Sequence, residues 1–359
     1  MTGYNKNTKL VPVLLGDPRR PDLVKPGRRF DQDDYLAVDE LKAALSCIND
    51  YEFYYIDEHD KMLEELIRLR PYYHIVLNLC DEGFNNDPLM EMHIPAILDV
   101  LNMRYTGAGP RCLSYCYDKS LVKSVAKDMG IPVPKSVLIN DLKDLDSIHV
   151  DFPLIVKPNF GDNSFGITYN SIVWTWYELN DRIRWMRGVL KYKRPIMLEE
   201  YIHGDDISVG IVGNPPNDYI FLPIIKEDYS GLPDGLPRIC CYEAKWMKGT
   251  PYDVVKSVRA ELSSGLNELI QNWCKMLFER FECRDYARFD WRLSKDGTPM
   301  LLEVNPNPGW VWDGHLNKMA SLANISYPEL LRMIISAAER RLMVKMDYDI
   351  LKSPRPGYL

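Results

Sequence analysis

The sequence has no excess of positive charge. Its 359 residues include 44 Lys and Arg against 51 Asp and Glu, a formal net charge of −7. No basic stretch interrupts this balance. Because nucleic-acid-binding surfaces need clustered cationic side chains, we expect no nucleic-acid partner.

The sequence also lacks an apolar run long enough to cross a bilayer, which takes about 20 residues. It shows no secretory signal at its start, so we expect no membrane partner and a cytoplasmic location. The eight cysteines are scattered. Cys112/Cys116 and Cys240/Cys241 lack metal-site spacing, which favours free thiols in a reducing compartment.

A nucleophilic centre is missing as well. No Ser/His/Asp or Cys/His arrangement stands out, and the six histidines do not cluster. His203 and His315 lie close to the motifs below, where an incidental position is the simpler interpretation. These absences favour chemistry that needs no nucleophilic side chain.

The most informative feature is a pair of short apolar strands with polar residues at alternate positions. The first carries Arg288 and Asp290, and the second carries Glu303 and Asn305. Alternation puts each polar pair on one face, and residues 294–299 are rich in hairpin formers. Paired strands would gather Asp290, Glu303 and Asn305 as oxygen ligands for Mg²⁺, with Mn²⁺ as an alternative. The other interpretation is a pair of amphipathic strands whose polar faces are exposed to solvent.

A second motif is an apolar strand that ends at Lys157 and runs into a loop, residues 159–166, with two glycines and small polar residues. Such a loop lets backbone amides approach phosphate oxygens, and a lysine can neutralise a phosphate. The glycine spacing fits neither a Walker A loop nor a dinucleotide-binding motif. An ordinary turn is the alternative.

A third motif begins at Glu199, where an apolar strand ends in acids, turns at Gly204 and returns as another strand. The backbone from Glu200 to Ile202 can pair with an adenine edge, and Asp206 can accept hydrogen bonds from ribose hydroxyls. An ordinary hairpin is the alternative.

The order of these motifs resembles that of the ATP-grasp superfamily, and within it the D-alanine–D-alanine ligase-like carboxylate–amine ligases. The resemblance covers about Val76 to about Arg340, and the order and spacing are more specific than any single motif. It implies an α/β fold in which a doubly wound, Rossmann-like sheet precedes two α+β lobes that enclose ATP. The residues that it places around the nucleotide are Lys119, Lys157, Asn163, Ser164, Glu199, Glu200, Tyr201, Ile202 and Asp206.

The resemblance also implies roles in the chemistry. Lys245 matches a lysine that reaches the phosphates, and Arg288 matches the arginine that steadies an acyl phosphate and a tetrahedral intermediate. Asp290, Glu303 and Asn305 match the Mg²⁺ ligands.

The sequence departs from the peptidoglycan-type ligases at several of their substrate-side positions. Asn163 replaces a loop serine, Trp246 replaces a tyrosine, and residues 16–21 replace the N-terminal segment that supplies a glutamate. We therefore expect an amine acceptor other than, or larger than, D-alanine. The candidate substrate contacts are Glu82, Gly309, Trp310 and Trp312. A simple Asn-rich turn is the alternative for Glu82, and packing against the C-terminal helices is the alternative for the two tryptophans.

The resulting functional hypothesis is an ATP-dependent ligase that joins amino acids or small peptides, with a homodimer implied by the resemblance alone. Two alternatives stay open: a nucleotide-binding regulator without ligase activity, and a tailoring ligase with a larger or carrier-bound acceptor. The expected domains are residues 1–112, a central lobe 113–198, a C-terminal lobe 199–346 and an extended tail 347–359.

Apolar periodicity predicts the secondary structure around these motifs. We expect N-terminal strands at 10–15, 53–56 and 75–79, and helices at 34–48, 61–69, 118–129, 174–190, 254–281 and 327–343.

Overall fold

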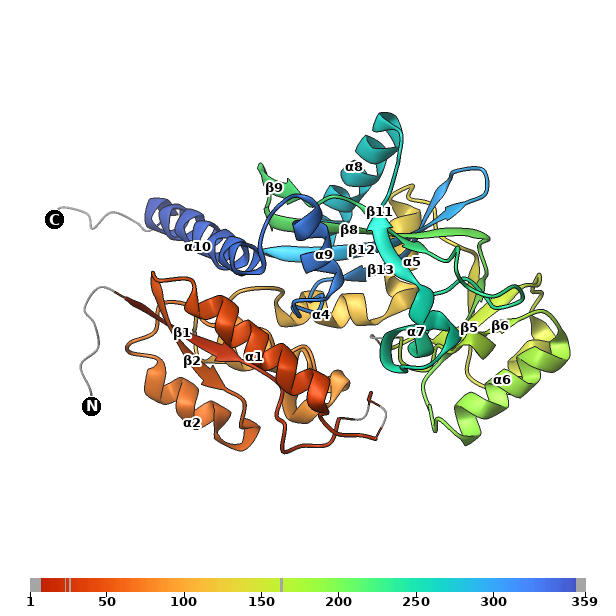
Figure 1. Ribbon diagram of the computed structural model, residues 1–359, viewed down its shortest axis with the longest axis horizontal. Coiled ribbons are helices and arrows are strands. Elements are labelled where there is room, and N and C mark those ends of the chain that lie inside the picture. The colour runs from red at the N-terminus through yellow and green to blue at the C-terminus, as the bar shows by residue number, and fades with distance from the viewer. Residues whose placement is uncertain (1–7, 23, 26, 162–163, 353–359) are drawn as a thin grey trace.

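The computed structural model describes residues 8–22, 24–25, 27–161 and 164–352, with side chains up to Met343. Three sheets form an N-terminal domain, a central lobe and a C-terminal lobe (Figure 1). The predicted α/β organisation, an N-terminal parallel sheet followed by two α+β lobes, is confirmed. None of the helices in the described ranges is both long and apolar enough to span a bilayer.

The N-terminal domain holds a parallel sheet in the order β2-β1-β3. Alternate residues of β1 face opposite sides: Val11 and Val13 pack with α1 and α10, whereas Leu10 and Leu14 pack with α2 and α3. Helices thus cover both faces, and the predicted β-α-β-α-β order is confirmed. The elements are β1 Lys9–Leu14, α1 Gln32–Ser46, β2 Tyr51–Ile56, α2 His59–Leu69, β3 Leu77–Asn78 and α3 His93–Val100.

The central lobe is an antiparallel sheet in the order β4-β7-β5-β6, covered on one face by α6. Val156 and Leu198 pack on the helix, so alternation turns Lys157 and Glu199 to the opposite face. The elements are β4 Ser136–Ile139, β5 Leu154–Pro158, β6 Ile172–Val173, α6 Trp176–Gly188 and β7 Ile196–Glu200.

The C-terminal lobe is built on a sheet in the order β11-β10-β8-β12-β13, with β9 paired to β8. Phe289 and Trp291 of β12 pack against α4, α5 and α8, so Arg288 and Asp290 face the other way. The elements are β8 Gly204–Asn214, β9 Asp218–Phe221, β10 Ile225–Asp228, α7 Tyr242–Trp246, β11 Lys256–Arg259, α8 Ser264–Arg280, β12 Tyr286–Ser294, β13 Pro299–Asn305, α9 His315–Leu322 and α10 Tyr327–Lys352.

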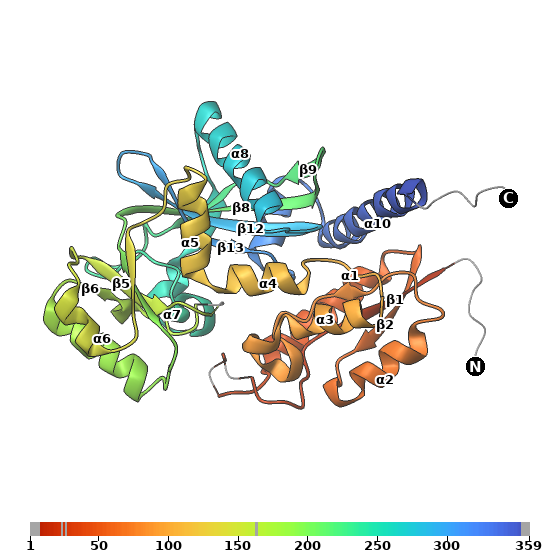
Figure 2. The same cartoon turned by 180° about the vertical axis from the view of Figure 1, so that it is seen from behind.

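Two helices lead from the N-terminal domain into the rest of the molecule, α4 (Pro110–Tyr117) and α5 (Lys119–Asp128). Val122 and Ala126 of α5 belong to the core beneath β12 and β13, and Figure 2 shows both helices beside that sheet. By packing, this segment lies with the C-terminal sheet, although the sequence analysis assigned residues from 113 onward to the central lobe.

The prediction of one helix over residues 254–281 is wrong in its first part. Residues Lys256–Arg259 form β11, which pairs antiparallel with β10. The helix begins only after Ser263, whose side chain accepts a hydrogen bond from the N–H of Leu266. An N-cap of this kind starts a helix, and the residues of β11 before it pair with β10.

The C-terminal helix is longer than predicted. Helix α10 runs to Lys352, so residues 347–352, assigned to an extended tail, are helical. The physical reason is that neither glycine nor proline interrupts the chain between Met343 and Pro354.

A buried carboxylate joins the N-terminal domain to the C-terminal lobe. Asp285, 0% exposed, accepts hydrogen bonds from the N–H of Gly107 at 2.8 Å and from Asn214 Nδ2 at 3.0 Å. Arg341 of α10 donates to both of its oxygens at 2.8 Å. Four segments distant in the sequence therefore depend on one side chain.

We expect Asp285→Asn to lower the free energy of unfolding by about 3 kcal/mol, because it leaves the guanidinium of Arg341 without a carboxylate. Asn also tolerates the positive φ of 67° at this position. The control is Asp218→Asn, which removes the exposed partner of Arg340 and should cost less than about 1 kcal/mol. If urea titrations show the same loss of unfolding free energy for both variants, the interdomain role of Asp285 is contradicted.

Candidate active site

A cleft between the central and C-terminal lobes gathers most of the predicted site residues. The hairpin is confirmed: β12 and β13 pair antiparallel, with Asp290 opposite Glu303 and Arg288 opposite Asn305. The predicted residues that line the cleft are Lys119, Lys157, Ser164, Glu199, Glu200, Tyr201, Ile202, Asp206, Lys245, Arg288, Asp290 and Glu303.

Asp290 is held as an anion on the wall of this cleft. Arg288 donates from Nε to Oδ1 at 2.9 Å and from Nη2 to Oδ2 at 2.8 Å, and the Ser208 hydroxyl donates to Oδ1 at 2.6 Å. Burial raises the pKa of Asp290, but the charge of Arg288 and these hydrogen bonds outweigh it and bring the pKa to about 2. The carboxylate is therefore ionised at neutral pH.

Glu303 is ionised for the same kind of reason. Lys119 Nζ lies 2.9 Å from Glu303 Oε2 and donates to the carbonyl oxygen of Gly161 at 2.6 Å. Burial acts to raise the pKa of Glu303, whereas the Lys119 ammonium lowers it and prevails. Lys119 thereby ties α5 both to β13 and to the loop after β5.

The donor set fits a hard cation such as Mg²⁺. Two ionised carboxylates lie opposite each other on paired strands, and Asn305 lines an adjoining recess together with Glu303. Asn305 Oδ1 accepts from the N–H of Asn307 at 3.0 Å. Across the described chain, no three His, Cys, Asp or Glu side chains gather as a metal site. A bound cation would therefore need Asn305 and ligand oxygens as well.

The residues predicted to contact the nucleoside are tied together by Arg292, which was not predicted as a site residue. Its guanidinium donates to Asp206, to the Tyr201 hydroxyl at 3.2 Å and to the carbonyl oxygen of Ile202 at 2.5 Å. The N–H of Tyr201 donates to the carbonyl oxygen of Pro153 at 3.1 Å. The backbone predicted to be open to adenine is thus partly used within the protein. Arg292 could have been found from its position two residues after Asp290, on the same face of β12.

The small-residue loop reaches the segment before α7. Ser164, at a positive φ of 58°, donates from its hydroxyl to the carbonyl oxygen of Cys240 at 2.9 Å. Lys245 on α7 lines the same cleft. Asn163, also predicted to contact the nucleotide, lies outside the described residues.

His315 was interpreted as incidental from the sequence, yet it lines the cleft at the start of α9. Its Nε2 lies 3.3 Å from Glu227 Oε1, and its buried Nδ1 has no hydrogen-bond partner among the described residues. Burial and then the charge of Arg288 lower the pKa of His315 to about 3. The imidazole is therefore neutral in the folded protein at neutral pH.

The two tryptophans do not share one pocket wall. Trp310 is 7% exposed and packs in the N-terminal core with Leu331 and Ile335 of α10, the alternative left open from the sequence. Its Nε1 donates to the carbonyl oxygen of Leu79 at 2.6 Å and to Asp81 Oδ1 at 3.0 Å. Trp312 is 42% exposed. Neither tryptophan nor Gly309 is among the residues that line the cleft.

Glu82 lies at the carboxyl end of the N-terminal sheet, also outside the cleft lining. A Cβ at Gly16 would lie 2.6 Å from the Glu82 carboxyl carbon, so only glycine leaves room for it. Glu82 Oε2 is buried without a hydrogen-bond partner among the described residues. Burial, then the charge of Asp81, raises the pKa of Glu82 well above its usual value.

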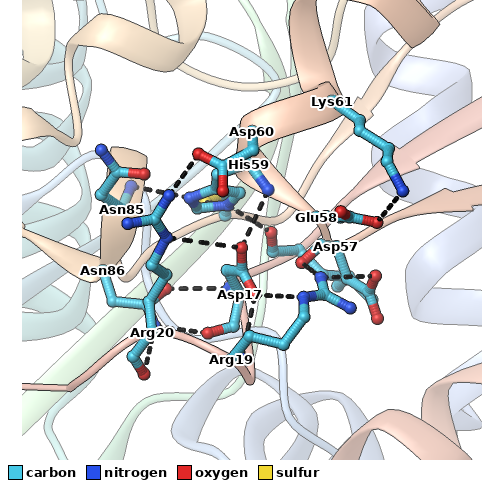
Figure 3. Close-up of polar contacts among 12 residues, drawn as sticks. Asp17, Arg19, Arg20, Asp57, Glu58, His59, Asp60, Lys61, Asn85 and Asn86 are labelled. Atoms are coloured by element: carbon cyan, nitrogen blue, oxygen red, sulfur yellow. Dashed lines mark hydrogen bonds and ion pairs between the residues drawn. The ribbon is translucent and has the colours of Figure 1, made fainter.

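The segment after β1, whose Gly16 lies against Glu82, is held in place by Asp17. Figure 3 shows the polar contacts of Asp17. The Asp17 carboxylate accepts from the N–H groups of His59 and Arg19, each at 2.9 Å. Asn86 accepts from the N–H of Asp17 at 2.8 Å and donates to its carbonyl oxygen at 2.7 Å. The loops after β1, β2 and β3 are thus joined at one edge of the parallel sheet.

We expect His315 to make the protein less stable in acid. Its folded-state pKa of about 3 lies below the usual histidine pKa of 6.5, so the unfolded chain binds the proton first. Stability should fall as the pH drops from about 6.5 toward 3, by up to about 1.4 kcal/mol per pH unit. His315→Gln should show a shallower decline than wild type in urea titrations from pH 8 to 5. The control His149→Gln, at a 92% exposed side chain, should follow wild type. Parallel curves for wild type and His315→Gln would contradict the burial of a neutral imidazole.

Comparison with known proteins agrees with this architecture. The family model described as D-ala D-ala ligase C-terminus matches residues 125–336. An uncharacterized protein of Sinorhizobium fredii is 31% identical over 69% of this chain and 70% of its own length. D-alanine–D-alanine ligase A of Bacillus cereus is 30% identical over 68% of this chain and 75% of its own.

Solved structures give the same result. The crystal structure of D-alanine–D-alanine ligase from Bacillus anthracis is 25% identical, with a TM-score of 0.70 over 94% of this chain and 100% of that one. The structure of that organism's ligase complexed with ATP has a TM-score of 0.69 at 24% identity, covering 94% of this chain and 100% of that one. Because the family model spans more than half of the 359 residues, the chain belongs to the D-alanine–D-alanine ligase family of ATP-grasp proteins.

Proposed function

We propose that the protein is an ATP-dependent carboxylate–amine ligase that joins amino acids or small peptides. The observation that carries the proposal is the meeting of cations and carboxylates in one cleft. Lys157 of β5 and Lys119 of α5 share its lining with Arg288, Asp290 and Glu303 of the hairpin. A site of this composition suits a polyphosphate with a divalent cation.

The nucleotide lies, in this proposal, between the central and C-terminal sheets. Lys119 and Lys157 neutralise its phosphates, the loop with Asn163 and Ser164 covers them, and Lys245 approaches from α7. The nucleoside contacts the segment from Glu200 to Ile202 and Asp206, whose position Arg292 fixes. Support comes from the shared cleft lining and from the related Bacillus anthracis ligase, which was solved with ATP.

Asp290, Glu303 and Asn305 are the residues that would hold Mg²⁺, or Mn²⁺. The metal, when bound, would neutralise phosphate charge during phosphoryl transfer. Ionised carboxylates support this assignment, because a protonated acid is a poor ligand for a hard cation. The pairing of each carboxylate with Arg288 or Lys119 keeps it charged until the cation arrives.

The reaction requires activation of a carboxylate, because its oxygen is a poor leaving group. One carboxylate oxygen attacks the γ-phosphorus of ATP, the bond to the β-phosphate oxygen breaks, and ADP leaves. The amine of the second substrate then attacks the acyl carbon of the acyl phosphate. It loses a proton, and inorganic phosphate leaves. Lys245 and Arg288 stabilise the negative charge that develops on the phosphoryl and carbonyl oxygens.

The substrates differ, in this proposal, from two molecules of D-alanine. Trp246 lies beneath Lys25, whose Nζ is 5.2 Å from the indole centroid, so a cation–π contact occupies this position. Glu82, wedged against Gly16, is the proposed contact for the amino group of the acyl donor. The acceptor contacts predicted at Gly309, Trp310 and Trp312 find less support, because these residues lie outside the cleft lining.

Glu303→Gln should reduce amine-dependent ADP release by about a hundredfold or more, because it removes a charged metal ligand that faces the transferred phosphoryl group. The control Glu268→Gln makes the same change at an exposed position of α8 and should leave the rate unchanged. ADP release at the wild-type rate by Glu303→Gln would refute the metal assignment.

Substrate identity is tested by measuring ADP release over a panel of D- and L-amino acids and dipeptides, with product masses. We expect release that depends on an added amine, and a weaker response to D-alanine alone than to the best pair. Efficient D-alanyl-D-alanine formation would overturn the proposed acceptor difference. If the protein binds Mg·ADP but forms no ADP from ATP with any amine, the alternative of a nucleotide-binding regulator without ligase activity would be favoured.

A further inference from the structure

Helix α5 presents two lysines one turn apart, and each binds a carboxylate of a different sheet. Lys119 contacts Glu303 of β13 at 2.9 Å, and Lys123 contacts Glu199 of β7 at 2.7 Å. Lys123 also donates to the carbonyl oxygen of Leu301 in β13 at 3.3 Å. The helix is therefore fastened to both lobes that form the cleft.

Glu199 is shared between two ammonium groups. Its Oε1 accepts from Lys157 Nζ at 2.7 Å, and its Oε2 lies 2.7 Å from Lys123 Nζ. The three side chains are almost inaccessible, with exposures of 1% for Glu199, 3% for Lys123 and 5% for Lys157. Lys157 and Glu199 line the cleft, whereas Lys123 is not part of its lining. Lys123 can thus affect a bound ligand only through its neighbours.

The charges of Glu199, Lys157 and Lys123 show what Lys123 contributes to the group. Two ammonium groups and one carboxylate leave an excess of one positive charge, whereas Glu199 alone would neutralise Lys157. Buried charges interact strongly because water screens them little, so this excess acts on whatever occupies the cleft. Burial lowers the pKa of Lys123 to about 8, against the opposing effect of Glu199. It stays largely protonated at pH 7.

We propose that Lys123 is a positioning residue: by sharing Glu199, it frees the Lys157 ammonium to attract the phosphates of a nucleoside polyphosphate. Glu199 then binds the two lysines through its carboxylate, in place of the direct nucleotide contact that the resemblance implies. The proposal rests on the proposed nucleotide site, but it does not depend on the ligation step.

The test is calorimetric binding of Mg·ADP to the full chain. Lys123→Met should weaken binding about tenfold, because Glu199 then neutralises Lys157 alone. The matched control is Lys127→Met, which removes the same charge one turn further along α5, at an exposed position. It should bind as wild type. Magnesium tripolyphosphate, which lacks the nucleoside, should lose affinity for Lys123→Met by the same factor as Mg·ADP.

Combining variants of Lys123 and Lys157 separates a positioning role of Lys123 from a purely structural one. Lys157→Met should itself weaken Mg·ADP binding. Adding Lys123→Met to it leaves the buried Glu199 without an ammonium partner, so this acid should take up a proton and the affinity should change by less than twofold. An equal loss in both backgrounds, or unchanged affinity in Lys123→Met, would overturn the proposal. Thermal melting checks that each variant is folded. If Lys123→Met does not fold, Lys123→Gln and its double variant with Lys157→Met undergo the same comparison.

The outcomes distinguish this inference from the proposed function. If wild type binds Mg·ADP and the variants show the expected coupling, but no amine leads to ADP release from ATP, the role of Lys123 is supported and the ligase function is refuted. Ligation with unchanged affinity in Lys123→Met would refute only the role of Lys123. No binding of Mg·ADP by wild type would refute both.

Discussion

The cleft depends on charge compensation across it, carried by helix α5. Lys119 binds Glu303 on one sheet and Lys123 binds Glu199 on another, while Arg288 holds Asp290 with two hydrogen bonds. Removing the partner of any of these buried charges would lower the stability of the folded protein. The Lys123–Glu199 pair therefore links the two lobes, and the other two pairs keep Glu303 and Asp290 ionised at the proposed site for a cation and phosphates.

Buried charge pairs likewise fix the proposed nucleoside contacts and the domain junction. Arg292 connects Asp206, Tyr201 and the backbone of Ile202, and Asp285 connects the N-terminal domain to α10 and β8. Both groups are buried and hydrogen-bonded, so they hold a single geometry. Glu82, the proposed substrate contact, is different, because burial raises its pKa and one of its oxygens has no hydrogen-bond partner among the described residues. A substrate group able to bind that oxygen would relieve this cost.

Local patterns predicted what depends on local physics. The hairpin that carries Arg288, Asp290 and Glu303 followed from strict alternation and a turn-rich connection, and the structure pairs these residues as expected. The helix predicted over residues 118–129 followed from apolar periodicity, and in the structure it begins at Lys119 with the Asp118 side chain as its N-cap. The prediction of a helix from residue 254 was wrong because the pairing of β11 with β10 outweighs local helical periodicity. Lys123, Arg292 and His315 were missed, although spacing of four or two residues from predicted site residues places the first two on the same faces.

The sequence by itself determined the fold family, the order of the motifs and most of the charged residues that line the cleft, because these follow from periodicity, turn chemistry and motif spacing. Only the tertiary structure decided how the charges are shared. Glu199 serves two lysines, Trp310 lies in a core formed with α10, and Glu82 fills the space left by Gly16. Each of these contacts joins segments far apart in the chain, and their geometry is set by the packing of whole sheets and helices.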